Sequence, residues 1–192
     1  MTTNHGDGAP ATNPAAPSAS EPASTPDKSA VASPVPTDWR TDGVCVVMGD
    51  QLDTNTPQTP GMNRAAAINH ARVGAQKLWA GTVTIHPNAK TGAHHHGALE
   101  SVIYVIRGRA RMRWGEHLEF TAEAGPGDFI YVPPYVPHQE INASENEALE
   151  CVLVRSDNDA VVINLDIAAV EQPEQVLWID PIHKHPHPHS HD

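Results

Sequence analysis

Short apolar runs separated by turn residues follow one another along the chain from residue 76 onward. Runs of this length, bounded by Gly, Pro or Asn-Asp pairs, are typical of strands. Strands are therefore expected over 77–86, 101–107, 109–114, 117–123, 128–133, 138–142, 147–155, 160–165 and 175–179. The run 44–48 also has strand length, and 64–71 fits either a short helix or an irregular strand. Many short strands without a clear helix predict an all-β sandwich or barrel.

The two ends of the chain differ in composition from its middle. Residues 1–36 are almost entirely Ala, Pro, Ser, Thr, Gly and Asn, which predicts a disordered tail. Residues 37–182 hold the expected strands and form the single folded domain predicted for a chain of 192 residues. Residues 183–192 form a His-rich tail, expected either to be an inert polar terminus or to bind Ni, Cu or Zn loosely.

Charge and cysteine content exclude several classes of protein. The formal net charge is -11, with 12 basic against 23 acidic residues, which argues against a nucleic-acid partner. Cys45 and Cys151 lie outside any C-x-x-C pattern, so each is expected to be a small buried hydrophobe in a reducing, cytoplasmic setting. No apolar run approaches the roughly 18 residues of a membrane span, and no secretory signal is evident. A membrane partner is therefore not predicted.

Four arginines alternate with other residues over 107–113. Because side chains two apart on a strand share a face, the arginines are expected on one face unless Gly108 introduces a bulge. That face is either solvated and paired with nearby acidic residues, or an anion-binding or subunit-contact surface. The acidic candidates are Glu116, Glu119 and Glu123.

Three consecutive histidines, His94, His95 and His96, precede Glu100 and the apolar run 102–106. On a strand His94 and His96 point the same way and can ligate one divalent ion, while His95 points opposite. A surface cluster of polar loop residues is the alternative interpretation. Downstream, a turn and a strand lead into a Pro-rich corner that sends the chain back through His138. This adds one more imidazole at the start of a strand.

These two stretches resemble the two sequence motifs of the cupin superfamily. Four residues match the second motif at full spacing: Gly127, Pro133, His138 and Asn142. Tyr135 stands in place of that motif's middle Gly. The first motif is matched by His94, His96, Glu100 and Gly108, whereas Asn88 stands where its opening Gly would be. The resemblance implies a single RmlC-like jelly-roll barrel, also called a double-stranded β-helix, and a metal held by His94, His96, His138 and Glu100.

The position of the acidic ligand is ambiguous. Counting back from Gly108 places Ser101, not Glu100, in the slot of the metal-binding Glu. A shift of one residue on a strand turns a side chain to the opposite face. Either a bulge restores Glu100 to the metal, or the site has three histidines and open positions for water and substrate. We favour Glu100, since its spacing from the histidine pair is a permitted variant of the family motif.

Three or four protein ligands leave positions free, which is the condition for a catalytic metal. This ligand set does not choose among Fe, Mn, Ni, Co, Cu and Zn. We expect a metal-dependent enzyme acting on a small organic molecule, first a mononuclear dioxygenase and hence an oxidoreductase, with isomerase, decarboxylase or lyase chemistry next. The alternative is a non-catalytic cupin that binds a metal or small ligand as a sensor or store. The resemblance also implies a homodimer.

The interior of the barrel is expected to be mostly apolar and suited to a small organic ligand. The candidate walls are Trp79, Ile103, Val105, Phe129, Tyr131 and Val152. Tyr104 and Tyr131 are expected to pack in the core or on the surface, or to donate a hydrogen bond to the ligand if either faces inward.

Overall fold

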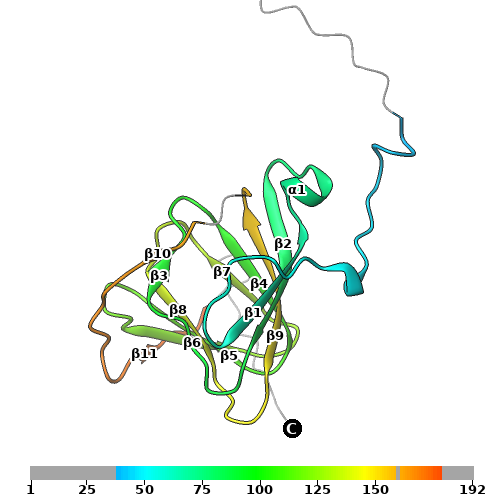
Figure 1. The fold of residues 1–192 in the computed structure, drawn as a ribbon. Helices are drawn as coiled ribbons and strands as arrows, with labels where there is room; N and C mark the ends of the chain where they lie inside the picture. Colours follow the sequence, from blue (N-terminus) through cyan, green and yellow to red (C-terminus); the bar gives the residue numbers. More distant parts are fainter. Residues whose placement is uncertain (1–37, 159–160, 179–192) are drawn as a thin grey trace, which may run out of the picture. The chain divides into compact units, whose positions relative to one another are not determined.

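A computed structural model describes residues 38–158 and 161–178. From Val44 onward these residues form one compact unit of two facing sheets (Figure 1). Residues 38–43 belong to a separate unit and form a turn closed by hydrogen bonds from the N–H groups of Thr41 and Asp42 to the Asp38 carbonyl. The predicted tails, 1–36 and 183–192, lie outside the described residues.

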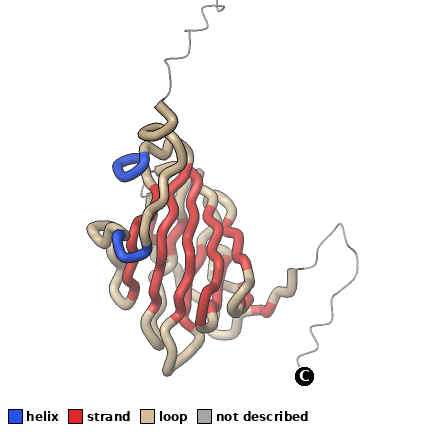
Figure 2. The backbone as a smooth tube through the Cα atoms, turned by 90° about the vertical axis from the view of Figure 1, so that its right-hand side faces the viewer, coloured by secondary structure: helices blue, strands red, loops and turns tan. Residues whose placement is uncertain are grey.

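The first sheet has five strands in the order β1-β2-β9-β4-β7, and Figure 2 turns it toward the viewer. The strands are β1 (Met62–Ile68), β2 (Leu78–Ile85), β9 (Leu149–Ser156), β4 (Ser101–Arg107) and β7 (Phe129–Val132). All its neighbouring strands pair antiparallel. Side chains therefore alternate between the two faces of the sheet, and the burial of β9 alternates accordingly from Leu149 to Ser156.

The second sheet has six strands in the order β10-β3-β8-β5-β6-β11. They are β10 (Ile163–Asn164), β3 (His94–His95), β8 (His138–Asn142), β5 (Ala110–Trp114), β6 (Phe120–Ala124) and β11 (Glu174–Gln175). Only β11 pairs parallel, with β6. Residues 161–178 supply a strand to each edge of this sheet and so span it from β3 to β6. The prediction of an all-β jelly roll is confirmed.

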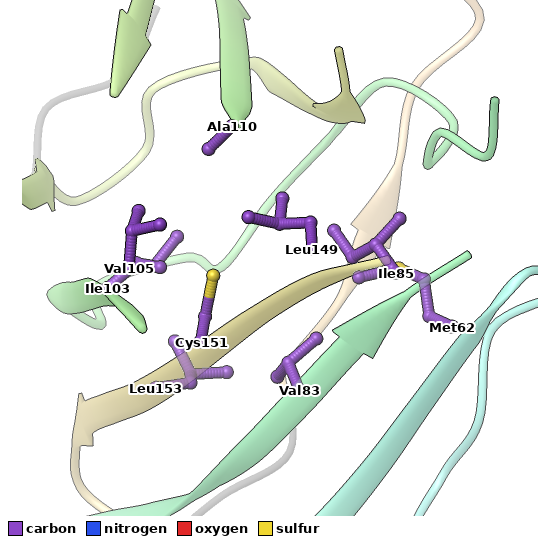
Figure 3. Close-up of a cluster of buried hydrophobic side chains, with 9 residues drawn as sticks. All are labelled: Met62, Val83, Ile85, Ile103, Val105, Ala110, Leu149, Cys151 and Leu153. Carbon is purple, nitrogen blue, oxygen red and sulfur yellow. The ribbon is translucent and has the colours of Figure 1, made fainter. Parts of the chain in front are cut away.

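Apolar side chains from the inner faces of both sheets form the core (Figure 3). The cluster consists of Met62, Val83, Ile85, Ile103, Val105, Ala110, Leu149, Cys151 and Leu153. In Figure 3, Ala110 of the second sheet lies across from the side chains of β4 and β9 in the first. Fully burying one large apolar side chain stabilises a fold by about 1.5–3 kcal/mol. This cluster therefore holds the sheets together, and burial of Cys151 is confirmed.

Helical structure is confined to two short segments in the described part of the chain. A 3-10 turn covers Gly49–Gln51, and α1 covers His70–Val73. Asn69 caps α1 by accepting a hydrogen bond from the Arg72 N–H, and Gly74 ends it with φ of 69°. The ambiguous segment 64–71 thus contains both the end of β1 and the start of α1. No described helix is long and apolar enough to cross a membrane.

Two sequence predictions near the start of the domain are wrong. Residues 44–48 form no strand, and Val44 and Val46 are 99% and 76% exposed. The run finds no partner strand, so its apolar residues stay outside the sheets. Cys45, expected to be buried, is exposed, while both cysteines are free of disulfide bonds as predicted.

The arginines of 107–113 do not form one continuous face. Gly108, with φ of 88°, separates the end of β4 from β5, and a Cβ there would lie 2.7 Å from the Ala148 carbonyl oxygen. Arg107 pairs with Glu150, whereas Arg109 and Arg111 both pair with Glu123. Arg113 instead donates to the backbone carbonyls of Leu118 and Val170. The solvated, acid-paired interpretation is thus supported for the first three arginines.

Candidate metal centre

Three histidines converge between the two sheets. His94 lies on β3 directly opposite His138, the first residue of β8, and His96 follows β3. Their exposed fractions are only 4%, 4% and 1% in the order His94, His96, His138. One ring nitrogen from each lies within 4.8 Å of the others. The structure therefore brings together the three histidines that the sequence motifs selected.

Backbone carbonyls fix the orientation of all three rings. The Nδ1 atoms of His94, His96 and His138 lie 2.9, 2.8 and 2.9 Å from the carbonyl oxygens of Gly92, Val161 and Val136. A carbonyl only accepts, so each Nδ1 carries the proton and each Nε2 keeps its lone pair. The Nε2 of His138 is buried and has no hydrogen-bond partner. Such an orphaned acceptor, with two more imidazoles close by, fits a bound divalent metal ion.

The electrostatics of the site keep the imidazoles of His96 and His138 in the form that binds metal. Burial lowers the pKa of His96 from 6.5 to about 3, and the positive charge of Arg155 contributes to the shift. Burial also lowers the pKa of His138. Both rings are therefore neutral at pH 7, and no proton competes with a metal for Nε2.

Glu100 does not join the histidines. Its side chain is exposed and accepts a 2.6 Å hydrogen bond from the Tyr131 hydroxyl, which raises the pKa of that phenol. Ser101, the first residue of β4, is instead buried at 2% exposure, with its Oγ unpartnered. No bulge at the start of β4 turns Glu100 inward, because Ser101 pairs in register with both Val132 and Arg155. The geometry thus favours the three-histidine alternative over the one we preferred from sequence.

His95 lies on the other side of the strand, in agreement with the expected alternation. It is half-buried, and its Nδ1 accepts a hydrogen bond from the Gly97 N–H. Its ring lies 6.1 Å from that of Tyr135. His95 therefore helps to shape the loop after β3 and stays outside the group of converging nitrogens.

Arg155 and Glu140 are two charged residues at the site that sequence reasoning missed. Arg155, 8% exposed, ends the inward-facing row of β9, and its Nη2 donates a 3.1 Å hydrogen bond to His96 Nε2. Glu140, also 8% exposed, lies two residues after His138 on β8. Burial lowers the pKa of the Arg155 guanidinium, and the charge of Glu140 opposes this. The alternation of apolar residues at 149, 151 and 153 was a signal that could have placed Arg155 inside.

The two departures from the motifs keep the backbone that the motifs require. Asn88 and Tyr135, which stand where the motifs have Gly, have φ of 60° and 61°. This left-handed conformation favours glycine, tolerates Asn and strains Tyr. The hydrogen bond from the Tyr135 N–H to the Gly97 carbonyl, 2.7 Å, holds the strained corner beside the histidines. Asn142 has a structural role, because its Nδ2 donates to the carbonyls of Ile85, His86 and Glu147.

A cavity of about 770 Å³ has His138 in its wall. Its lining is mostly apolar and comes from β5, β6 and β7, the Pro-rich corner and residues 176–178. Of the expected walls, Phe129 and Tyr131 line it, while Ile103 and Val105 belong to the core and Trp79 packs against the core. Tyr104 packs on Phe129 with ring centroids 4.8 Å apart. A small organic molecule in this cavity can contact His138.

Two facing, mostly antiparallel sheets with three buried histidines between them define a jelly-roll domain of the cupin type. A comparison with family profiles agrees, because residues 81–155 match the family described as "Cupin domain". The matched segment contains all three histidines, Ser101 and Arg155. Residues 81–155 therefore form a cupin domain, as the motifs predicted. No curated protein sequence matches the chain.

Solved structures with a similar fold carry different activities. The polyketide cyclase RemF from Streptomyces resistomycificus superposes with a TM-score of 0.54 at 22% identity, covering 68% of this chain and 89% of RemF. KdgF from Halomonas sp. superposes with a TM-score of 0.50 at 17% identity, covering 61% of this chain and 96% of KdgF. Oxalate decarboxylase from Lactobacillus farciminis superposes with a TM-score of 0.50 at 21% identity, covering 59% of this chain and 34% of the decarboxylase chain. Identities this low establish the shared fold alone.

Proposed function

We propose that the domain is a mononuclear metal enzyme acting on a small organic molecule. The observation that carries this proposal is the set of three buried imidazoles whose Nδ1 atoms are fixed by backbone carbonyls and whose ligand nitrogens lie within 4.8 Å of one another. Three protein ligands leave coordination positions open, in contrast to the closed four-ligand sphere of a structural site. The adjoining cavity gives an organic molecule access to those positions.

The protein's own residues bind and orient the reactants. His94, His96 and His138 would hold the ion, which supplies Lewis acidity and, if redox-active, one-electron chemistry. Trp114 and Val132 in the cavity wall would pack against the organic part of the substrate and exclude water. Dioxygenase chemistry is our first candidate reaction, followed by isomerase, decarboxylase and lyase chemistry. The candidate ions remain Fe, Mn, Ni, Co, Cu and Zn.

Metal analysis of the purified protein tests the site. Residues 183–192 are removed so that their histidines do not contribute, and about one ion per chain is expected. His96→Ala and His138→Ala should lower metal affinity by at least about 100-fold, because each removes one of three ligands. His95→Ala is the matched control and should retain the ion. Stoichiometric metal in both ligand variants would refute the assignment.

Turnover separates an enzyme from a binding module. Oxygen consumption by the metal-loaded protein with a panel of enolic and catecholic compounds would support the dioxygenase. Conversion of a panel compound without oxygen uptake would point to the isomerase, decarboxylase or lyase group. Loss of either activity in His138→Ala, but not in His95→Ala, would place the reaction at the three histidines.

A non-catalytic cupin that binds a small ligand is the second candidate. The observation that favours it is the hydrogen bond from Arg155 to His96 Nε2, which occupies one of the three lone pairs. A protein of this kind would show ligand binding without turnover, and its metal content would fall below one ion per chain.

We also propose a homodimer in the cytoplasm. The outer face of β4 and β7 exposes Val102 and Ile106, together with Phe129 and Tyr131, which also line the cavity. Neighbouring apolar side chains of this kind are often covered by a second subunit. The two free cysteines are in keeping with a reducing compartment. The molar mass in solution, measured by light scattering, tests the dimer.

A further inference from the structure

Arg155 is a buried cation without an acidic partner at bonding distance. The salt bridges of residues 38–158 and 161–178 involve Arg107, Arg109 and Arg111, and none includes Arg155. Its Nε is buried and makes no hydrogen bond, and its Nη2 donates only to His96. Arginine is rarely buried to this extent unless its donors are matched by an anion. The guanidinium therefore has unused capacity directed into the site.

Ser101 stands across from Arg155 and carries a second unpartnered group. The two residues are paired in register on neighbouring strands and are both buried, so their side chains share the inner face. In the motif this position carries the Glu that brings a carboxylate to the metal. Here the chain places a hydroxyl there, and that hydroxyl has no partner. Two unpartnered hydrogen-bond donors thus lie on the same inner face of the sheet, next to His96.

The charge balance around these two donors calls for a further negative group. The negative charge of the buried Glu140 raises the pKa of Arg155. The positive charge of the half-buried Arg64 lowers the pKa of Arg155. One positive charge remains uncompensated among these three. The imidazoles of the site are neutral ligands, so a divalent ion would add two more positive charges. A bound anion would offset this excess.

We propose that Arg155 and Ser101 bind the carboxylate of a small organic acid next to the three histidines. The Arg155 Nε–H and one Nη–H would donate to the two carboxylate oxygens, a geometry that suits the planar guanidinium, and the Ser101 hydroxyl would donate to one of them. Since His138 also lines the cavity and its ring centroid lies 5.1 Å from that of His96, the apolar body of the acid would extend past Trp114. This inference rests on the proposed function, because it identifies the bound organic acid with the substrate of the proposed enzyme.

Binding of benzoate and its neutral analogue benzamide tests the proposal. Calorimetric titrations use the full chain, metal-free after treatment with a chelating resin, and again loaded with Zn²⁺. Benzoate should bind at least about tenfold more tightly than benzamide, because only benzoate matches both guanidinium donors. Equal affinities for the two compounds in both forms of the protein would overturn the proposal.

Variants locate the binding at these two residues. Arg155→Met should weaken benzoate binding at least about tenfold, and Ser101→Ala about threefold. Arg155→Lys keeps the charge without the planar fork and should lie between the wild type and Arg155→Met. Arg107→Met, which removes an exposed arginine, is the control and should bind like the wild type. Wild-type affinity in both Arg155 variants would refute the assignment.

Two further measurements keep the outcomes separable. Circular dichroism and thermal melting check that Arg155→Met folds, and Arg155→Lys and Ser101→Ala test the site independently if it does not. The titrations of metal-free protein do not depend on the metal analysis. Benzoate binding that depends on Arg155, in a protein without stoichiometric metal, would uphold the carboxylate site and reject the metal enzyme. Stoichiometric metal in a protein that binds benzoate no more tightly than benzamide would uphold the metal site and reject the carboxylate site.

Discussion

The two ends of the barrel interior differ in chemistry although the same strands build both. At one end Val105, Leu149 and Cys151 pack without polar partners and are almost fully buried. At the other end Ser101, Arg155 and the three histidines are just as buried, yet several of their polar atoms lack hydrogen bonds. Burial is thus equal at both ends, whereas three of the four unsatisfied buried side-chain atoms in the described residues belong to the histidine end. A natural core leaves few polar groups unsatisfied, so the histidine end is the candidate site for a ligand.

Strand β9 shows how one element serves both ends. Its inward residues are apolar at 149, 151 and 153, and charged at 155. The apolar part is fixed by packing, so the position of Arg155 is fixed as well. A rigid core at one end of a strand thus positions a functional group at the other.

Truncation in the apolar end should have the largest effect on stability. Leu149→Ala removes a side chain that is 2% exposed and leaves a cavity, which should cost about 3 kcal/mol in the free energy of unfolding measured with urea. The metal content per folded chain should stay unchanged. Loss of the ion from folded Leu149→Ala protein would show that the two ends are not independent.

Acidification should destabilise the metal-free protein through the polar end. The pKa of His96 is about 3 in the folded state and near 6.5 when unfolded, so the unfolded chain takes up a proton first as the pH falls. The stability that neutral His96 contributes is complete above pH 6.5 and decreases from there toward pH 3. Between pH 7 and 5 the loss should be about 1 to 2 kcal/mol.

Urea denaturation at several pH values measures this dependence. His96→Gln removes the titrating group and should flatten the decrease between pH 7 and 5, whereas His95→Gln should leave it in place. Identical slopes for His96→Gln and the wild type would contradict the electrostatic description of the polar end.

Substitution just outside the polar end should have the smallest effect. Glu100→Ala removes an exposed hydrogen bond to Tyr131 and should change the free energy of unfolding by no more than about 0.5 kcal/mol. Metal content should remain at the wild-type level, because the carboxylate faces away from the histidines. A drop in metal content would restore Glu100 as a ligand and make the site a four-ligand one.

The sequence predicted the parts of the molecule that depend on local pattern. Alternation and turn residues located the strands from β2 onward except β3, and motif spacing selected His94, His96 and His138. Errors arose where the outcome depended on a distant partner. Residues 44–48 have strand-like composition but no strand to pair with. The choice between Glu100 and Ser101 depended on the register of β4 against β7 and β9, which a single sequence does not fix.

The carbonyl of Val161 sets a limit on how this domain can be cut and recombined. The segment that matches the family ends at residue 155, yet the atom that orients His96 belongs to a residue beyond it. A chimera built on the matched segment alone would carry all three histidines and leave the His96 ring without its backbone anchor. The segment that matches the family is therefore shorter than the segment needed to orient His96. Grafting experiments should include residues 161–178.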